Sequence, residues 1–404
     1  KSLNHSLSKS LSHCVIHILR GQNLLSSSYA DSAMNENTAK TPRIVHILSG
    51  DLWAGAEVMA CHLLPGLHSR PDCHLLAVVL NEGQVAARLR QAGLQVVILD
   101  ESRVSFPRLL QHVRKTLNAF QPQIIHSHRY KENILAYLAS RGRARISLIA
   151  TQHGMPESHG KKSTLKGRLL RKINFTLLSR RFDTLVAVSR EMKETLVHNG
   201  FGPSSLAVIH NGIELPPWHG PRESNGDFVV GSCGRLFAVK NYSLFIEMAA
   251  QVAAQSPQAG FQLAGDGPLM EDLRRQCSQY SLNGRFVFLG HIRDMPAFYQ
   301  GLKVYVSTSW HEGMPMSVLE AKSYGLPVVA PNVGGFPEII ENEKDGFLIP
   351  GHDPGLFAQA CLRLQSDPAL LTRMSAAARE KVEASFSVQH MTQEYHRLYQ
   401  KLAR

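Results

Sequence analysis

The sequence alternates short apolar segments with amphipathic helical segments, and this alternation occurs twice. The first series is RIVHILS, CHLLAVVL, LQVVIL, QIIHSH, SLIATQ, TLVAVS and LAVIH, and the second is FVVGSCG, FQLAG, RFVFLG, KVYVST and LPVVAP. These strands are continuously apolar instead of alternating, which is typical of a parallel sheet covered by helices on both faces. The pattern predicts an α/β protein with two Rossmann-like, doubly wound parallel-sheet domains.

The two series are separated by a Pro- and Gly-rich stretch, NGIELPPWHGPRESNGD, which is typical of a linker. We therefore predict an N-terminal domain over residues 41–215, a linker over 216–227 and a C-terminal domain over 228–384. The amphipathic helix at 385–404 is expected to cross back toward the N-terminal domain. Ligands of such sheets bind at the carboxyl ends of the strands, so a ligand-binding cleft is expected where the two domains face each other.

The first 40 residues differ in composition from the rest of the chain. They are Ser-rich and basic, they contain no acidic residue before Asp31, and residue 1 is not Met. A transit peptide has this composition, and so does an upstream extension of a chain that naturally begins at Met34. We favour the second interpretation and expect residues 1–40 to be a disordered extension.

Charge and cysteine usage narrow the class of protein. The formal net charge of +12 and the pI of about 9.5 predict an anionic partner, although charge alone does not distinguish phosphate, nucleotide, nucleic acid and lipid. The six cysteines form no CxxC pair and no zinc-type spacing, which favours reduced cytosolic thiols. No apolar run reaches the roughly eighteen residues of a membrane helix, so we expect a soluble or peripheral protein.

The strongest site signal is the end of the first strand of the C-terminal domain. The stretch GSCGRLFAVKN places Gly234, Arg235 and Lys240 just before a predicted helix start. Glycine lets the backbone approach a ligand, a helix start favours anions, and Arg and Lys neutralise a diphosphate, Arg bidentately and Lys as a point charge. Such a stretch on its own is usually a solvated turn, but its place at the ligand-binding edge of a parallel sheet favours a phosphate site.

Two further strand ends in this domain match that site. In LAGDGP we expect Asp266 to bond to the backbone of its own turn. In LGHIRDMPAFY the backbone groups of Ile292 and Arg293 are candidates for hydrogen bonds to a nucleobase edge.

The stretch SWHEGMPMSVLEAKSYGLPVVA carries Glu312 and Glu320, eight positions apart. Eight helical residues span about 12 Å, more than the roughly 5–9.5 Å between the carboxyl groups of a glycosidase pair. We infer that the two carboxylates bind hydroxyl groups at opposite ends of one long ligand, with an anion facing free N–H groups of the helix's first turn near Met316 to Val318. An exposed or capping role fits Glu312 acceptably and Glu320 poorly. The candidate binding residues of this stretch are Gly313, Met314, Met316, Ser317, Val318 and Glu320.

These motifs, together with VGGFPEIIENEKDGFLI and in this order, resemble the retaining glycosyltransferases of family four, which have the GT-B fold and an EX7E motif. The resemblance runs from about Arg43 to the C-terminus. It implies that Glu312 contacts the donor sugar, that Glu320 contacts the nucleotide ribose, and that Arg235 and Lys240 hold the diphosphate.

The N-terminal domain matches this family more loosely. SGDLWAGAEVMACHLL is similar to the family's glycine-rich loop, although Ala54 replaces a usual glycine and Gly55 remains. The family often has a functional histidine at strand ends such as HSHRYKENI and TQHGMPE, and we choose His128 first and His153 second. A lone histidine at a strand end is more often structural.

Several other classes of site are excluded or disfavoured. GMPESHGKKST has the wrong glycine spacing for a P-loop, and no GxGxxG follows the first strand of either domain, which counts against a dinucleotide dehydrogenase. The sequence has no Asp-x-Asp, which disfavours a metal-dependent transferase of the other major fold. We predict no metal and no cofactor apart from a nucleotide-diphosphate sugar as donor substrate.

The run KKSTLKGRLLRKINFTLLSRR, residues 161–181, is basic and has Leu165, Leu169, Ile173 and Leu177 at helical intervals. Basic amphipathic helices bind anionic membrane surfaces. A solvated helix whose apolar stripe packs on its own domain is about equally compatible with the sequence. The resemblance implies that the N-terminal domain, which contains this run, binds the acceptor, and because many relatives extend lipid-linked glycans this position favours the membrane slightly.

The resemblance implies retaining, metal-independent transfer of a sugar from a UDP- or GDP-linked donor to a glycan or lipid-linked acceptor. The expected context is cell-envelope polysaccharide or lipopolysaccharide synthesis, in the cytoplasm or peripherally at the inner face of the cytoplasmic membrane, with no nucleic-acid partner. Two alternatives stay open. One is a GT-B nucleotide-sugar 2-epimerase, and the other is a non-catalytic nucleotide-sugar-binding protein.

Overall fold

The computed structural model describes residues 41–50, 55–143, 145–154, 165–218, 220–221, 226–282 and 284–403, and side chains at 165–171 are not described. The described residues belong to one compact unit. The predictions for residues 1–40 and for Ala54 lie outside the described residues.

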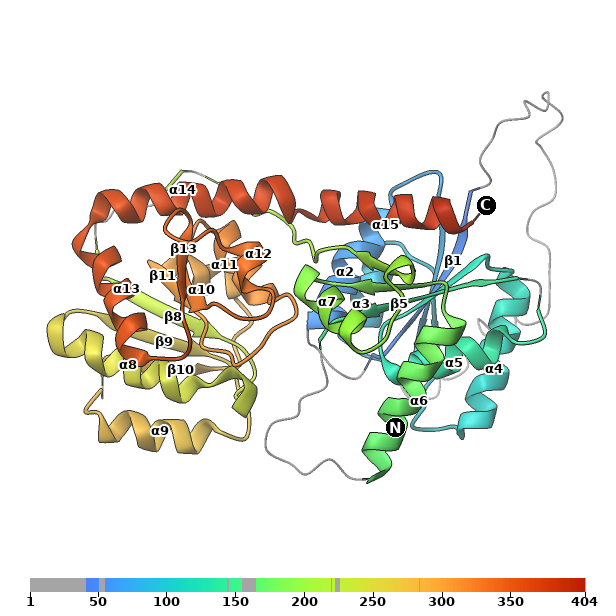
Figure 1. The fold of residues 1–404 in the computed structure, drawn as a ribbon, viewed down its shortest axis with the longest axis horizontal. Coiled ribbons are helices and arrows are strands. Elements are labelled where there is room, and N and C mark those ends of the chain that lie inside the picture. Colours follow the sequence, from blue (N-terminus) through green and yellow to red (C-terminus); the bar gives the residue numbers. More distant parts are fainter. Residues whose placement is uncertain are drawn as a thin grey trace, which may run out of the picture. The chain divides into compact units, whose positions relative to one another are not determined.

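The first half of the chain builds a seven-stranded parallel sheet (Figure 1). Its strands are β1 (Arg43–Leu48), β2 (His74–Val79), β3 (Val96–Ile98), β4 (Ile124–Ser127), β5 (Ser147–Gln152), β6 (Thr184–Ala187) and β7 (Leu206–Val208). The strand order is β3-β2-β1-β4-β5-β6-β7. Strand order therefore reverses between β1 and β4, which is the switch point where doubly wound sheets bind ligands.

Helices connect these strands, as the alternating pattern predicts. They are α2 (Gly55–His68), α3 (Gln84–Gln91), α4 (Phe106–Phe120), α5 (Tyr130–Ser140), α6 (Leu165–Arg181), α7 (Arg190–His198) and the short η1 (Pro203–Ser205). Successive residues of β1 enter different cores. Ile44 and Leu48 pack in one hydrophobic cluster with α2 and α3, whereas Val45 and Ile47 pack in another with α4 and α5. The sheet is thus covered on both faces, which is why its strands are continuously apolar.

The second half of the chain builds a six-stranded parallel sheet in the order β10-β9-β8-β11-β12-β13. Its strands are β8 (Val229–Cys233), β9 (Gly260–Ala264), β10 (Phe286–Gly290), β11 (Val304–Val306), β12 (Val328–Pro331) and β13 (Gly346–Ile349). Its helices are η2 (Ala238–Lys240), α8 (Tyr242–Gln255), α9 (Met270–Gln279), α10 (Met295–Gly301), α11 (Met316–Ser323), α12 (Phe336–Ile339), α13 (Pro354–Ser366) and α14 (Pro368–Ser385). The switch point of this sheet lies between β8 and β11.

The last helix, α15 (Val388–Leu402), packs on the first sheet, and Figure 1 shows it following α14. Its Met391, Tyr395 and Tyr399 belong to the same hydrophobic cluster as Ile44 of β1. Two backbone hydrogen bonds join the segment after β7 to the residues at the start of this helix. The amide of Ile213 donates to Phe386 O at 2.9 Å, and the amide of Val388 donates to Ile213 O at 2.9 Å.

Candidate functional site

Arg235 and Lys240 follow β8, and the loop that carries Glu312 follows β11, so the switch point of the second sheet brings them together. Nζ of Lys240 lies 2.5 Å from Oε1 of Glu312. The same carboxylate oxygen accepts a hydrogen bond from Oγ of Ser309 at 2.8 Å. The Arg235 guanidinium lies over the ring of Phe237, 5.1 Å from its centroid. The structure therefore places two cations and one carboxylate at neighbouring strand ends.

The loops after β8 and β9 interlock through glycines. Gly234 donates its amide to Ala264 O at 3.0 Å, and Leu236 donates to Asp266 O at 2.9 Å. Gly265 has φ +131°, and a Cβ there would lie 1.9 Å from Gly234 O. Only glycine permits this backbone conformation and this approach. The contact fixes the loop that leads to Arg235 and Lys240.

The other two strand-end predictions have different outcomes. Oδ1 of Asp266 accepts from the amide of Gly267 at 2.7 Å, so the turn role predicted for Asp266 is confirmed. Ile292 and Arg293 lie just after β10 at the edge of the sheet, two strands from β8. Their contact with a nucleobase stays a prediction.

The helix α11 presents Glu320 to a buried tyrosine. The hydroxyl of Tyr299 donates to Oε2 of Glu320 at 2.7 Å. Burial raises the pKa of Glu320, and the bond from Tyr299 acts in the opposite direction by stabilising the carboxylate. The prediction of free N–H groups in the first turn is wrong for Val318, whose amide donates to Pro315 O at 3.1 Å. This shorter bond tightens the helix start, as in a 3₁₀ turn.

A glycine pair in the later motif supports the loop of Glu312. Gly335 donates its amide to Glu312 O at 2.9 Å. A Cβ on Gly335 would lie 2.0 Å from Gly313 O, and a Cβ on Gly334 would lie 2.3 Å from Glu312 O. The Gly-Gly pair of VGGFPEII is thus needed for close backbone packing beneath the candidate site, a role that sequence reasoning did not assign.

Four histidines gather in the first sheet: His46 and His126 lie within β1 and β4, and His128 and His153 follow the carboxyl ends of β4 and β5. Nδ1 of His46 lies 3.2 Å from Nε2 of His128, and Nδ1 of His128 lies 3.2 Å from Nε2 of His153. The rings of His126 and His128 stack with centroids 4.4 Å apart. The two predicted histidines, His128 and His153, are therefore neighbours, and sequence reasoning missed His46 and His126.

Helix α15 contributes two tyrosines to this cluster. The hydroxyl of Tyr399 lies 2.7 Å from Nδ1 of His126 and 3.2 Å from Nε2 of His46. Nε2 of His126 lies 2.8 Å from Oγ1 of Thr151, which lies 3.0 Å from the hydroxyl of Tyr395. The only signal in the sequence is the His-x-His spacing of QIIHSH, because Tyr399 lies 273 positions from His126.

Burial keeps these histidines neutral. It lowers the pKa of His46 and of His153 to about 3, and it lowers the pKa of His126 and His128 well below the usual value. Ligand atoms of His46, His126 and His128 lie within 4.8 Å of one another, a spacing that allows a metal ion. All six ring nitrogens of these three residues already have hydrogen-bond partners, so hydrogen bonding accounts for the cluster. The absence of a metal stays a prediction.

Predicted residues of the two sheets approach one another. A Cβ on Gly313 would lie 2.7 Å from His153 O, and a Cβ on Gly55 would lie 3.7 Å from Cγ of Met316. Nδ2 of Asn211 donates to Met314 O at 3.4 Å. The histidine cluster therefore adjoins the loop that carries Glu312.

A carboxylate that sequence reasoning missed joins the same two halves of the chain. Glu338 of α12 accepts from the amide of Arg190 at 2.6 Å, at the first residue of α7. Its other oxygen lies 2.7 Å from Nε2 of His210. The pKa of Glu338 is lowered although burial opposes this, because hydrogen bonds from His210 and from the α7 amides stabilise the carboxylate.

The basic run at 161–181 falls partly outside the described residues. In its described part Ile173 is 46% exposed, whereas Leu178 is buried. Leu177 packs partly against the domain core. The two described members of the predicted stripe thus differ, since Ile173 faces solvent and Leu177 packs partly against the core. No helix in the described part of the chain is both long enough and apolar enough to cross a membrane.

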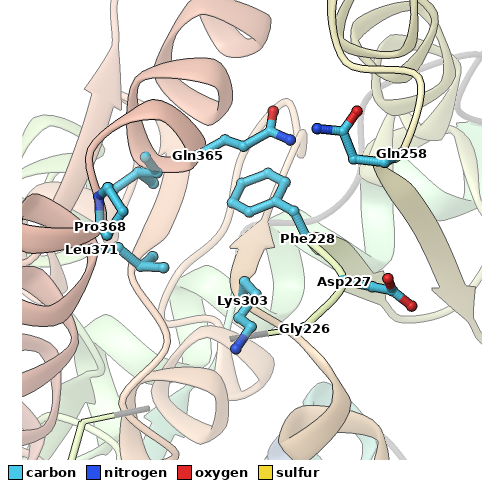
Figure 2. Close-up of a pocket in the computed structure, with 9 residues that line it drawn as sticks. Gly226, Asp227, Phe228, Gln258, Lys303, Gln365, Pro368 and Leu371 are labelled. Carbon is cyan, nitrogen blue, oxygen red and sulfur yellow. The ribbon is translucent and has the colours of Figure 1, made fainter. Parts of the chain in front are cut away.

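A pocket of about 250 Å³ lies at the amino ends of the strands of the second sheet, opposite the carboxyl ends that carry the candidate site. Phe228 and Lys303 line it, and these residues precede β8 and β11 instead of following them. Figure 2 shows Gln258 and Gln365 pointing toward one another beside the Phe228 ring. The pocket is therefore separate from the strand-end site.

Comparison with known proteins identifies the class. Residues 53–215 match the family model described as Glycosyltransferase Family 4, and residues 219–381 match that of Glycosyl transferases group 1. An Escherichia coli relative, UDP-Gal:alpha-D-GlcNAc-diphosphoundecaprenol alpha-1,3-galactosyltransferase, is 31% identical over 68% of this chain and 74% of its own length. A Streptomyces bingchenggensis D-inositol 3-phosphate glycosyltransferase is 25% identical over 64% of this chain and 62% of its own length.

The fold has a close match among solved structures. Anabaena HepE in complex with UDP and glucose superposes with a TM-score of 0.76 at 21% identity, covering 88% of this chain and 99% of that one. The fold and the two family models define a GT-B glycosyltransferase. The chain belongs to glycosyltransferase family 4.

Proposed function

We propose that this glycosyltransferase is a retaining, metal-independent enzyme that moves a sugar from a UDP-sugar to a lipid-linked glycan acceptor. The contact between Lys240 and Glu312, with Arg235 on the same loop, is the observation that carries the proposal. The UDP specificity and the acceptor class are suggested by the E. coli relative, whose name specifies UDP-galactose and a diphosphoundecaprenol acceptor.

The site suits a reaction dominated by departure of a diphosphate. Negative charge grows on the leaving oxygens, and preorganised cations stabilise it most. The Lys240 ammonium has three N–H donors, so it can bind Glu312 and a phosphate oxygen together. Arg235 adds a planar guanidinium that fits phosphate geometry. These two residues supply the positive charge that a metal ion supplies in other transferases.

The two glutamates fit different tasks. Oε1 of Glu312 is held by Lys240 and Ser309, and both contacts stabilise its negative charge. A carboxylate held in this way is a poor nucleophile and a good acceptor for a sugar hydroxyl. Glu320 lies deeper, against Tyr299, and we assign it the ribose hydroxyls. We therefore propose same-face displacement guided by the leaving phosphate, which retains the anomeric configuration.

We assign acceptor binding to the first half of the chain and place the enzyme at the inner face of the cytoplasmic membrane. The exposed Ile173 on α6, beside the exposed Lys172 and about two helical turns before the exposed Arg180, supports contact with anionic lipid. Liposome co-sedimentation tests this assignment. Binding should need anionic lipid and weaken with salt, and equal binding to neutral vesicles would contradict it.

The test of the proposed function is incubation of the purified chain with a panel of UDP- and GDP-sugars, with and without undecaprenyl-diphosphate-linked GlcNAc. We expect transfer from one UDP-sugar and an α-linked product from an α-linked donor, read by NMR of the anomeric proton. A β-linked product would contradict retention. Release of an epimerised sugar without acceptor would favour the 2-epimerase, and binding with no turnover would favour the binding protein.

A further inference from the structure

The histidine cluster forms one unbranched chain of hydrogen bonds. It runs from Tyr395 through Thr151, His126, Tyr399, His46 and His128 to His153. Nδ1 of His153, its last atom, is shielded from water and has no hydrogen-bond partner among the described residues. That atom lies in the residue whose carbonyl adjoins Gly313 of the candidate site.

This chain of hydrogen bonds has only two consistent arrangements of protons. Each neutral imidazole has one N–H donor and one acceptor nitrogen, and each hydroxyl has one proton to donate. The hydroxyl of Tyr399 lies between two acceptor-capable nitrogens and donates to only one of them. A choice at Tyr399 therefore fixes the tautomer of His126 on one side and, in sequence, those of His46, His128 and His153 on the other.

Burial of the Tyr395 end selects one of the two arrangements. Tyr395 is 1% exposed, and Oγ1 of Thr151 is its hydrogen-bond partner. If Thr151 donated to Tyr395, two buried groups would lack a partner among the described residues, the phenol proton of Tyr395 and the acceptor nitrogen Nδ1 of His153, whereas the opposite direction leaves only one, the N–H at Nδ1 of His153. Each unsatisfied buried group is unfavourable, so the opposite direction is favoured. If Tyr395 donates to Thr151, each donor along the chain has an acceptor as far as His153, whose proton then resides on the outermost nitrogen, Nδ1.

We propose that Tyr399 of α15 is a positioning residue, which fixes this chain in the direction that leaves an N–H donor at Nδ1 of His153. The donor is available to an oxygen atom of the bound nucleotide sugar, a sugar hydroxyl or a phosphate oxygen, and this last step rests on the proposed function. The C-terminal helix α15 thus packs against the first sheet and, through Tyr399, also determines which ring nitrogen of His153 carries the proton.

The charged and titratable groups around the hydrogen-bonded histidines favour the neutral form of the imidazole rings. The pKa of His128 is depressed first by burial, then by the other three histidines and by Arg129. The Arg129 guanidinium contacts the Glu57 carboxylate at 2.7 Å. The proposal therefore concerns tautomers of neutral imidazoles, and no ring has to gain a proton.

The test is long-range ¹H–¹⁵N NMR of the ligand-free protein labelled in histidine, with resonances assigned from single His→Gln variants. We expect His46, His126, His128 and His153 all to carry the proton on Nδ1. In Tyr399→Phe this uniform Nδ1 protonation should be lost, and His46 and His128 should each show both tautomers. Tyr395→Phe is the matched comparison from the same helix. It should keep the tautomers, because the Thr151 hydroxyl then becomes the buried end of the hydrogen-bond chain and has to donate its own proton to His126.

The outcomes separate this proposal from the proposed function, because the tautomers are read without substrate. Nε2-protonated His153, or identical tautomers in wild type and Tyr399→Phe, would overturn the proposal even if the enzyme transfers sugar. Stoichiometric zinc on the purified protein, measured by elemental analysis, would overturn it too, since a bound ion would replace these bonds. With an established donor, Tyr399→Phe should lower kcat about tenfold and leave the donor KM within about twofold.

Discussion

Nζ of Lys240 lies 2.5 Å from Oε1 of Glu312, so a cation predicted to hold diphosphate and a carboxylate predicted to hold sugar are partners in the same site. Both side chains are mostly buried, with 20% and 18% exposed. Sequence reasoning treated them as separate contacts at different parts of the ligand. Their pairing means that Glu312 also orients the ammonium group.

Lys240→Met should lower kcat/KM by about 10² or more, because it removes a charge that stabilises the leaving diphosphate. Glu312→Gln should lower it as well. The double variant should lose less than the sum of the two effects, since residues in direct contact are non-additive. Steady-state kinetics with the established donor measures all three. Lys344→Met, at a surface pair with Glu341, is the control and should match wild type. Strict additivity would show that the pairing has no role.

Tyr299→Phe should weaken donor binding more than turnover. Its hydroxyl donates to Glu320 and favours the ionised form of a carboxylate whose pKa burial raises. Loss of a hydrogen bond to a charged group corresponds to about 1.5 kcal/mol or more, or roughly a tenfold rise in donor KM. Initial rates against donor concentration give the two parameters. Tyr280→Phe, an exposed tyrosine on the same half of the chain, should leave both unchanged. A fall in kcat at constant KM would refute the ribose assignment.

Gly335→Ala should disturb the Glu312 loop, because the new Cβ would lie 2.0 Å from a backbone oxygen that cannot move independently. We expect a loss of about 1–3 kcal/mol in the free energy of unfolding, measured by denaturant titration, together with reduced activity. Gly301→Ala is the matched control, because a Cβ there meets nothing within 4 Å. Equal stability of the two variants would contradict the packing argument.

Lys322→Met should destabilise the second half of the chain strongly. Lys322 is fully buried, and its Nζ contacts Oδ1 of Asp345 at 2.7 Å and Ile339 O at 2.8 Å. Removing one member leaves a buried charge unpaired, which costs about 3–5 kcal/mol. Adding Asp345→Asn should recover much of this loss, since the amide oxygen still accepts from Glu341 N. If the double variant is less stable than Lys322→Met, the pair is not the cause.

The histidine cluster should make the protein acid-sensitive. Burial lowers the pKa of His46 and His153 from 6.5 to about 3, so the unfolded chain binds more protons than the folded chain between these values. Their contribution is therefore complete above pH 6.5 and is lost as pH falls from 6.5 toward 3. Each neutral ring adds up to about 1.4 kcal/mol per pH unit to the slope.

Denaturant titrations across this pH range measure that slope. His153→Gln should reduce it, whereas replacement of the exposed His112 by Gln should leave it unchanged. A slope in His153→Gln equal to that of wild type would show that His153 titrates in the folded protein as it does in the unfolded chain.

The sequence predicted those features that depend on residues close together in the chain. Continuous apolar strands revealed both parallel sheets, and the amphipathic segments between them correspond to the helices that connect the strands. The strand-end motifs predicted that Arg235, Lys240 and Glu312 share the ligand-binding end of one sheet, because parallel strands end on the same side; the strand order that places them at its switch point came from the structure. Resemblance to a family then supplied candidate roles that spacing alone does not give.

Features that depend on distant residues could not be predicted. The bonds of His126 and His46 to Tyr399 join segments that only the packing of α15 brings together. The buried Lys322–Asp345 pair and the Glu338 contact with α7 have no periodic signature in the sequence. The tight helix start that engages the Val318 amide depends on the local backbone conformation after Pro315, which apolar spacing does not report.

A structure of the protein with the UDP-sugar that supports transfer tests the central claim most directly. We predict that phosphate oxygens lie within hydrogen-bonding distance of Nζ of Lys240 and of the Arg235 guanidinium, with the sugar against Glu312 and the ribose against Glu320. A diphosphate bound elsewhere, or Lys240 and Arg235 directed away from it, would contradict the claim.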